Sequence, residues 1–529
     1  MEQNLFKENL KYDIAASVVV FLIALPLCLG IALASGAPLF SGMIAGVIGG
    51  LVVGVLSNSH TSVSGPAAGL TAVVLVAIQQ LGHYETFLLA ALLAGVLQLI
   101  LGFIRAGSIA NYIPSNVIKG MLTGIGIIII LKQIPHALGY DKDVEGDEAF
   151  LQADGENTFT AIWHTLTDYI HPGATLVALL SLGIMILWTR PAVKKWVGPV
   201  PGALAAVAAS IGLNALFALL GGPWVIESAH LVNIPVAAGA SEFFALFRAP
   251  DFSQWQNPQI LSVAVTLCAV ASIETLLCIE AVDKIDPLKR STDANRELRA
   301  QGIGNIVSAL IGGLPITSVI VRSSANLDAG ARTKLAAIAH GALLLICVLA
   351  IPGLLNKIPL ASLAAVLILV GYKLAKVSIF KEMWANGKYQ WWPFIITVLA
   401  VVFTDLLSGV LIGLAASVFA ILRGNMKTAY FFHREQYNQG DLIRIELAQE
   451  VSFLNKAAIK LTLDHLPENS SVLIDASKTS YIDYDVLELI KEFQQAQAKM
   501  KNIELTLKGF RDKYLLEEAD FVHVEHKNQ

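Results

Sequence analysis

The sequence predicts an all-α membrane domain followed by a small α/β domain. Hydrophobic residues make up 55% of the 529 residues and charged residues only 15%, whereas soluble domains are about a quarter charged. The shortage of charge is confined to residues 1–428, where apolar runs of membrane-spanning length follow one another. From residue 429 to 529 the polarity is that of a soluble domain, so we expect two domains divided there.

Fourteen apolar segments are expected to span the membrane. An even number places both termini on one side, and fourteen divides into two sets of seven. Because seven is odd, the second set would be inverted relative to the first. The segments are 14–34, 40–56, 66–80, 86–104, 117–131, 174–189, 201–220, 260–282, 299–312, 317–328, 335–352, 358–374, 392–404 and 406–423.

The distribution of Lys and Arg predicts that both termini are cytoplasmic, at the inner membrane of a cell. With this orientation the outer loops hold four basic residues: Lys132, Lys142, Arg248 and Lys357. The inner loops hold fifteen: Arg105, Arg190, Lys194, Lys195, Lys284, Lys289, Arg290, Arg296, Arg299, Arg332, Lys334, Lys373, Lys376, Lys381 and Lys388. The outer loop 132–173 is acidic, in keeping with a solvated loop. The run 14–34 is too long for a signal peptide and is interpreted as a retained span.

Composition and motifs argue against several classes of function. A net charge of −4 gives no support to nucleic-acid binding. Cys28, Cys268, Cys278 and Cys347 lie in apolar runs, so they are expected to be buried thiols. We find no H-E-x-x-H spacing, Walker loop or nucleophile elbow. The protein is therefore expected to be no enzyme and to need no cofactor.

Two short segments occupy matching places in the two sets of seven. Segment three begins at "SGPAAGL", and segment ten begins at "IGGLPITSVIVRSS", with Gly312, Gly313 and Pro315. A helix of about eleven residues rises about 17 Å, roughly half of a ~30 Å hydrocarbon core, so it must start near mid-membrane. Facing N-termini of two half-helices would bind an anion through backbone N–H groups. The alternative for each segment alone is a kink in a longer helix.

The substrate site predicted from these starts includes backbone, hydroxyl and charged groups. The hydroxyls of Ser62, Ser64, Thr317 and Ser318 are expected either to donate to an oxyanion or to cap the helices. Arg322 is expected to add positive charge, to pair with a carboxylate or to extend toward the interface. The predicted substrate-binding residues are Ser64, Gly65, Ala67, Ala68, Gly69, Pro315, Ile316, Thr317, Ser318 and Arg322.

One carboxyl group lies inside a long apolar run. Glu274 interrupts "LSVAVTLCAVASIETLLCIEAV", where a charge costs on the order of 3 kcal/mol on insertion scales. Beside an anion site, such a group could bind a proton or a cation such as Na⁺ and couple its movement to the anion. The alternative is a structural carboxyl satisfied by neighbouring helices.

These motifs resemble those of the sulfate permease (SulP) anion transporters over essentially the whole chain. "IPSNVIKG", "ASIETLL" and "ANRELRAQGIGNIVSALIGGLPITSVIVRSSANLDAGARTKLA" carry the resemblance. It implies a seven-plus-seven inverted repeat with core and gate domains, half-helices three and ten, a cytoplasmic STAS domain and a homodimer. It also implies elevator-like movement of the core, and a site formed by "SGPAAG", Glu274 and "PITSV".

The chain departs from the family at two positions. Sodium-coupled cyanobacterial bicarbonate members have Asp and, four residues later, Thr where this chain has Glu274 and Cys278. The loss of the hydroxyl weakens the sodium assignment and makes proton coupling a rival. Animal members place Ser before the span-ten Arg, whereas Val321 stands here, so their chloride site does not transfer whole.

The C-terminal region resembles a STAS domain. "LIRIELA", "SSVLIDAS" and "IELTLKGF" have the pattern of strands, the last of them closing the domain, and "KAAIKLTLDHL" and "DVLELIKEFQQAQAKM" that of helices. Asp485 stands where anti-sigma-factor antagonists have a phosphorylated serine, which argues against that switch. The loop around it also resembles that of SulP proteins associated with carbonic anhydrase, so a functional link to carbonic anhydrase, and bicarbonate as substrate, are expected.

The sequence thus predicts a symporter of a small oxyanion, bicarbonate ahead of sulfate, driven by Na⁺ or H⁺. The open alternatives are proton-coupled sulfate or dicarboxylate uptake, anion exchange, an anion channel, and a membrane scaffold whose STAS domain is the working part.

Overall fold

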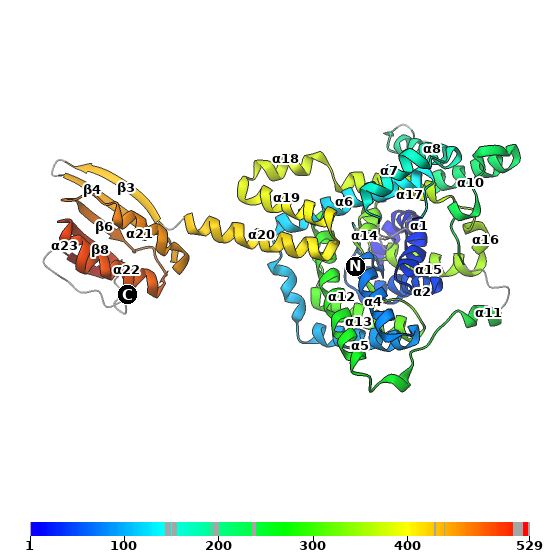
Figure 1. Cartoon of the computed structure of the whole chain (residues 1–529), viewed down its shortest axis with the longest axis horizontal. Coiled ribbons are helices and arrows are strands. Elements are labelled where there is room, and N and C mark those ends of the chain that lie inside the picture. The colour runs from blue at the N-terminus through cyan, green and yellow to red at the C-terminus, as the bar shows by residue number, and fades with distance from the viewer. Residues whose placement is uncertain are drawn as a thin grey trace. The chain divides into compact units, whose positions relative to one another are not determined.

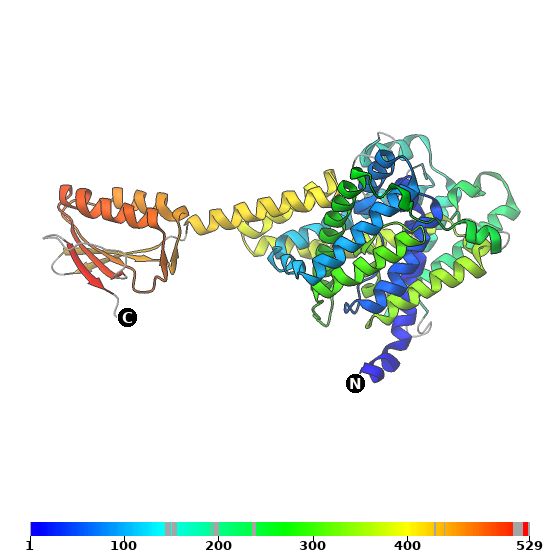
Figure 2. The ribbon, with the colours of Figure 1, turned by 90° about the horizontal axis from the view of Figure 1, so that it is seen from below.

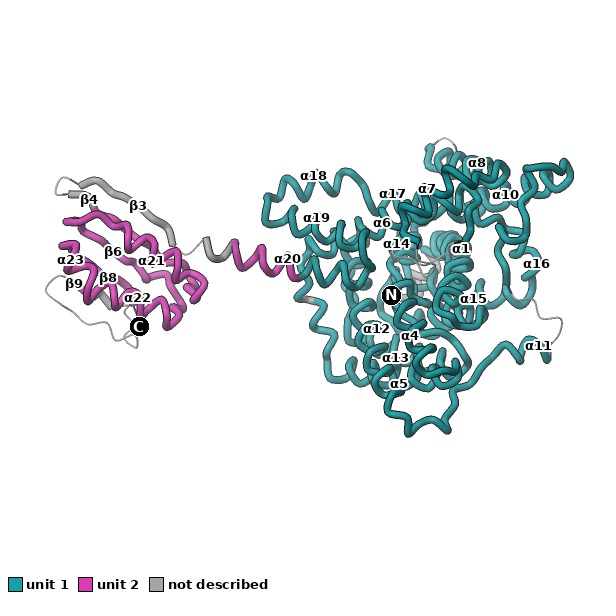
Figure 3. Tube along the Cα trace, in the orientation of Figure 1, with its two compact units in different colours: residues 1–414 teal, residues 415–529 magenta. Residues whose placement is uncertain are grey.

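The computed structural model consists of two compact units, residues 1–414 and 415–529 (Figure 3). The division falls inside α20 (Leu406–Lys427). The structure describes residues 2–142, 150, 156–191, 193, 200–234, 240–427, 430–437, 440–510 and 522–526. Residues 143–149 and 151–155 of the expected acidic loop, together with Lys194 and Lys195, lie outside these residues.

The first unit is helical (Figure 1), and every one of the predicted apolar segments corresponds to a helix. In order these are α1 (Glu2–Ala34), α2 (Leu39–Ile48) continuing to α3 (Gly54–Leu56), α4 (Thr71–Leu81), α5 (Tyr84–Phe103), α6 (Ser115–Leu138), α8 (Pro172–Trp188), α10 (Gly202–Leu220), α12 (Pro258–Ile285), α13 (Ala294–Leu310), α14 (Ile320–Asp328), α15 (Leu335–Ala350), α17 (Leu360–Leu374), α19 (Lys388–Phe403) and α20. Short helices α7 (Thr158–Asp168), α11 (Ala240–Ala245), α16 (Pro352–Leu355) and α18 (Val377–Ala385) connect them.

The helices differ in their capacity to cross a membrane. Among the described residues, eight are long and apolar enough by length and composition, or nine if α7 and α8, which meet at 116°, form one span. Shorter apolar helices include Ala68–Leu81, Leu335–Ala350 and Lys388–Phe403. The chain is therefore a mostly helical, multi-pass membrane protein, and its third apolar segment is short, as predicted.

Some basic residues lie in different places from those predicted. Lys132 is buried inside α6 rather than exposed in an outer loop. Lys284 lies in the last turn of α12, and Arg296 and Arg299 lie in α13. These three basic residues were predicted to lie in a loop between two spans, but they lie at the ends of helices α12 and α13.

The helices of the first unit form two sets that pack more closely within themselves than with each other. In one set α13 lies along α5 and α1 along α15, and in the other α6 packs on α17 and α19. A Cβ at Gly302 would lie 2.7 Å from the backbone nitrogen of Leu99, so α13 can approach α5 this closely only with glycine there. This contact fixes α13 beside the centre of the first unit.

Two extended segments meet at that centre. β1 (Ser64–Pro66) and β2 (Ile316–Ser318) pair antiparallel, with Gly65 opposite Thr317. All six residues are buried. The sequence did not predict this strand pair, because three residues are too few to show the alternation that identifies a strand.

The second unit contains a five-stranded sheet in the order β3-β4-β6-β8-β9. β3 (Tyr430–Tyr437) and β4 (Gly440–Leu447) are antiparallel, and β6 (Ser471–Asp475), β8 (Glu504–Phe510) and β9 (Val522–His526) continue in parallel. Helices α21 (Lys456–Asp464), α22 (Tyr484–Glu492) and α23 (Ala498–Met500) cover one face of the sheet (Figure 2). The prediction that "IELTLKGF" is the last strand is wrong, since β9 follows it.

Candidate functional site

The strand pair leads directly into the two short helices. After β1 the chain turns through a 3-10 segment, Ala68–Leu70, into α4, and after β2 it passes Val319 into α14. In the part of the chain that the structure describes, the N-cap residues of these starts, Ala67, Leu70 and Val319, make no side-chain capping hydrogen bond. The expectation that nearby hydroxyls cap the helices is therefore wrong. The starts of α4 and α14 keep backbone N–H groups without a capping side chain.

The hydroxyls bond across the strand pair instead. Ser62 and Ser318 share a short hydrogen bond, and Ser318 Oγ also lies 3.1 Å from the sulfur of Cys278. Thr317 donates to the carbonyl of Ser318 at 3.2 Å. These contacts join the segment just before β1 to β2 and α12 in one polar centre.

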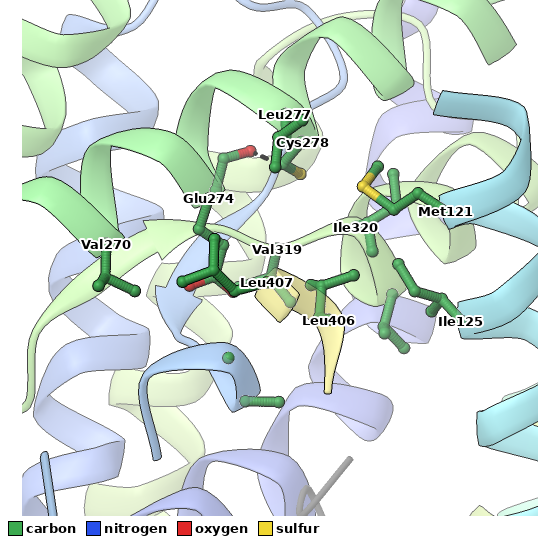
Figure 4. A pocket seen from close by; sticks show the side chains of 14 residues that line it. Met121, Ile125, Val270, Glu274, Leu277, Cys278, Val319, Ile320, Leu406 and Leu407 are labelled. Carbon is green, nitrogen blue, oxygen red and sulfur yellow. Dashed lines mark hydrogen bonds between the residues drawn. The ribbon is translucent and has the colours of Figure 1, made fainter. Parts of the chain in front are cut away.

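A cavity of about 30 Å³ lies beside this centre (Figure 4). Its size admits only one or two water molecules or a small ion. Five of the predicted site residues line it: Ala68, Gly69, Glu274, Cys278 and Ser318. The rest of the wall is apolar and comes from α6, α12, α14 and α20, including Met121, Ile125, Val270, Ile320, Leu406 and Leu407. The contributions of α6 and α20 were not predicted, because no polar residue marks them in the sequence.

Glu274 brings the only carboxyl group to the described wall of this cavity. Its side chain is buried in the middle of α12. A Cβ at Gly69 would lie 3.0 Å from its Oε1, so the start of α4 passes directly against the carboxyl group. Within the described chain, no group of three or more His, Cys, Asp or Glu side chains is placed to hold a metal ion.

The remaining predicted residues, apart from Arg322, belong to β1, β2 and the residues next to them. Ser64, Gly65, Ala67, Pro315, Ile316 and Thr317 are buried but do not line the cavity. The backbone of Ile316 is held from α13, since Asn305 Oδ1 accepts its N–H at 2.5 Å and Asn305 Nδ2 donates to its carbonyl at 3.0 Å. The repeat of polar residues every four positions along α13 could have revealed this support in the sequence.

Arg322 does not reach the cavity. Its side chain is completely buried in α14, and Nη2 donates to the sulfur of Cys28 at 3.3 Å. A Cβ at Gly65 would lie 2.1 Å from its Nη1, so only glycine at that position admits the guanidinium group. Among the described residues no ion pair involves Arg322. The expectations of a carboxylate partner and of extension to an interface are therefore wrong, and the group remains a fixed, enclosed positive charge.

A second cavity, of about 1,860 Å³, lies between α1 and α14 on one side and α8, α10 and α17 on the other. The charged residues of its lining are mostly basic, with Asp286 and Asp328 as the acidic residues. The basic residues are Lys11, Arg290, Arg296, Arg332, Lys334 and Lys373. Such a lining raises the local concentration of anions.

The sequence and the fold are similar to those of known proteins. The model of the sulfate permease family matches residues 10–412. The chain belongs to the sulfate permease family. It is thus an anion transporter of a family whose members are transporters rather than enzymes.

Relatives within the family differ in substrate. The bicarbonate transporter BicA of Picosynechococcus sp. is 28% identical over 71% of this chain, which spans 63% of that protein's length. The sodium-independent sulfate anion transporter of Bos taurus is 26% identical over 95% of this chain and 85% of its own length. The structure of SLC26A9 shares the fold, with a TM-score of 0.66 and 17% identity over 98% of this chain and 89% of that chain.

Proposed function

We propose that the protein is a secondary active transporter that imports a small oxyanion, bicarbonate or, as the second candidate, sulfate. The observation that carries the proposal is the meeting of two uncapped helix starts beside a cavity that contains Glu274. Backbone N–H groups at helix starts bind anions because they combine free donors with a positive dipole end. The fully buried charge of Arg322 adds to the positive potential there.

The membrane domain is proposed to comprise residues 1–428, with fourteen spans in two inverted sets of seven. The half-helices α4 and α14 are its third and tenth spans. Residues 429–529 are proposed to form a cytoplasmic STAS domain, as the mixed sheet with helices on one face supports. A homodimer and an inner-membrane location with both termini in the cytoplasm belong to the same proposal.

Transport is proposed to proceed by alternating access. The helix set that contains α1 and α14 would move as the core against the gate set that contains α8, α10 and α17. The large basic cavity separates these two sets. Its basic residues come largely from the loops expected on the cytoplasmic side, so this conformation would open inward.

Coupling is proposed to reside at Glu274. A carboxyl group next to the anion site could carry a proton or contribute an oxygen ligand to Na⁺. The Cys278 thiol, which replaces a hydroxyl ligand, favours the proton. The similar sulfate transporter of Bos taurus is named as sodium-independent, which supports the same choice.

Uptake into proteoliposomes tests the proposal. Radiolabelled bicarbonate and sulfate are compared under an imposed Na⁺ or H⁺ gradient, with Glu274→Gln as the test variant and Glu280→Gln as the matched control on the same helix. Glu280 is half-buried and pairs with Lys284 away from the cavity. We expect saturable, gradient-driven uptake that only Glu274→Gln uncouples. Non-saturating flux that ignores both gradients would contradict the proposal and indicate a channel.

A further inference from the structure

A second buried carboxyl group lies close to the anion site but outside the cavity. Glu297 in the first turn of α13 is completely buried. Its Oε2 accepts a short hydrogen bond from Ser57 Oγ, and its Oε1 accepts one from Gln301 Nε2 at 3.0 Å. No ion pair among the described residues includes Glu297. A buried acid held only by neutral donors can change its protonation state when its surroundings change.

Gln301 connects this acid to the start of the first half-helix. The same Nε2 that donates to Glu297 also donates to Ser64 Oγ at 2.7 Å. Ser64 is in β1, one residue before Gly65. A side-chain amide nitrogen carries two hydrogens, so both bonds can form together. Gln301 Oε1 has no hydrogen-bond partner among the described groups, and the bridge therefore runs through the nitrogen alone.

The direction of these bonds depends on the charge of Glu297. When Glu297 is ionised, it accepts only, so Gln301 must present its nitrogen. Ser64 then accepts from Gln301, and its own hydroxyl hydrogen is free to point elsewhere. Ser57 is oriented in the same way, because its oxygen accepts the N–H of Ser59 at 3.0 Å and its hydrogen must go to Glu297.

Protonation of Glu297 reverses the direction of these hydrogen bonds. An O–H on Glu297 becomes a donor, and rotation of the Gln301 amide by 180° brings Oε1 to the position of Nε2. That oxygen accepts from Glu297 and from Ser64, so the hydroxyl hydrogen of Ser64 turns toward Gln301. The two states differ in one proton and in the direction of every bond between Glu297 and Ser64.

We propose that Glu297 is a positioning residue whose protonation, relayed by Gln301, decides whether the hydroxyl of Ser64, in β1 before the start of α4 and outside the cavity lining, is free to donate toward an anion bound between the helix starts. The inference rests on the proposed anion site between the two helix starts. An ionised Glu297 keeps the donor available and the anion bound, and a protonated Glu297 withdraws it and favours release. Glu297 is distinct from Glu274, which lines the cavity and acts on the coupling cation.

Other charges around α13 bear on this switch. Charged groups near Glu297 include Asp283 of α12 and Arg296 of α13. Asp283 is held by the backbone N–H and hydroxyl of Thr292, and Arg296 Nε donates to the carbonyl of Leu56. The hydrogen bonds from Gln301 to Glu297 and to Ser64 place the acid two hydrogen bonds away from β1.

The test is the pH dependence of anion affinity for the full-length protein. Binding of sulfate, which stays fully ionised from pH 5 to 8, is measured by thermal shift, and KM by uptake into proteoliposomes. Every variant is also made with Glu274→Gln, so that titration of the cavity carboxyl group does not contribute, and these double variants are compared by sulfate binding alone because Glu274→Gln is expected to uncouple uptake. We expect wild-type affinity to fall roughly tenfold as Glu297 protonates, the effect of losing one hydrogen bond to a charged group.

Three variants separate a switch from a structural contact. Glu297→Gln should make the affinity independent of pH, and Ser64→Ala should make it low and equally independent of pH. Ser57→Ala removes a donor that stabilises the carboxylate, so the midpoint of the pH dependence should rise. Glu280→Gln should keep the wild-type profile.

The outcomes distinguish this inference from the proposed function. Saturable binding whose pH slope survives in Glu297→Gln or Ser64→Ala would overturn the switch and leave the anion site intact. An unmoved midpoint in Ser57→Ala would also overturn it, even if Glu297→Gln failed to fold. Absence of saturable binding and uptake of both sulfate and bicarbonate by the wild type would overturn the proposed function and this inference with it.

Discussion

Glu274 and Arg322 carry opposite charges and lie against the same short segment, which runs from β1 to the start of α4. They differ in what surrounds them. The carboxyl group of Glu274 lies against Gly69 and lines a cavity, whereas the guanidinium group of Arg322 lies against Gly65 with no exposed surface. A group next to a cavity can exchange a proton or an ion. An enclosed group keeps its charge and acts through its field. The comparison assigns coupling to Glu274 and fixed attraction for the anion to Arg322.

The largest effect is expected from closing the space that holds the enclosed charge. In Gly65→Val a side chain would begin 2.1 Å from Arg322 Nη1, so the guanidinium group or the strand pair must move. We expect loss of transport and a free energy of unfolding lower by about 1–3 kcal/mol, as in overpacked cores. Uptake and thermal unfolding check this, and wild-type transport would show that Arg322 need not lie there.

Removing the enclosed charge should separate stability from function. Burying a charge costs desolvation free energy, and Arg322 has no ion-pair partner among the described residues to offset it, so Arg322→Met should keep or raise the melting temperature. Anion affinity should fall roughly 30-fold, the equivalent of about 2 kcal/mol at an effective dielectric constant of about 20. Melting temperature and KM are measured together. An unchanged KM would remove Arg322 from the account.

Crowding Glu274 should have a smaller effect than crowding Arg322. In Gly69→Ala the new methyl group would lie 3.0–3.3 Å from the carboxyl group of Glu274, a contact that a side chain next to a cavity can relieve. We expect a severalfold change in the dependence of uptake on the driving gradient, with KM for the anion nearly unchanged. If Gly65→Ala and Gly69→Ala lost transport to the same extent, the proposed difference between the enclosed Arg322 and the cavity-lining Glu274 would be wrong.

Restoring a hydroxyl group at position 278 sharpens the assignment of the cation. Cys278→Thr places an oxygen one helical turn from Glu274, in the cavity wall. If the thiol is what disfavours Na⁺, this variant should gain a modest stimulation of uptake by external Na⁺, with Cys268→Thr as control on the same helix. A wild type that already requires Na⁺ would refute proton coupling.

The smallest effect on transport is expected from the cluster formed by Asp141 and two histidines, which contacts neither Glu274 nor Arg322. His136 and His230 each direct Nδ1 to the carboxylate of Asp141, at 2.6 and 2.5 Å. The hydrogen bonds from both histidines hold the pKa of Asp141 below its usual value, and the bond to Asp141 raises the pKa of His230. Their stabilisation is therefore present between the two pKa values, is lost in acid as Asp141 protonates, and is lost in base as His230 deprotonates.

Asp141→Asn tests that remote cluster. It should lower the melting temperature by about 2 °C near pH 6 and by less at pH 4 or 9, while KM remains that of the wild type. A shift in KM as large as that of Arg322→Met would mean that the strand pair is not the separate centre of anion binding.

The sequence predicted the two short helices because Gly and Pro mark their starts, and the predicted range 66–80 agrees with α4 and the turn before it. It also assigned Glu274, Gly69 and Ser318 to one site, and all three line the same cavity. It missed the strand pair and β9, whose short segments carry little periodicity. The sequence left open where the side chain of Arg322 points, because this depends on its rotamer and on the space that Gly65 leaves. The role of Glu297, Gln301 and Asn305 was not predicted. Polar residues at every fourth position of a span share one helix face, and this pattern could have indicated it.

A density map of the full-length protein with selenate, a heavier analogue of sulfate, tests the central claim most directly. The account predicts one strong peak between the starts of α4 and α14, beside Ser318 and the cavity that contains Glu274. Selenate found only in the large basic cavity, with the two helix starts empty under conditions that saturate uptake, would contradict it.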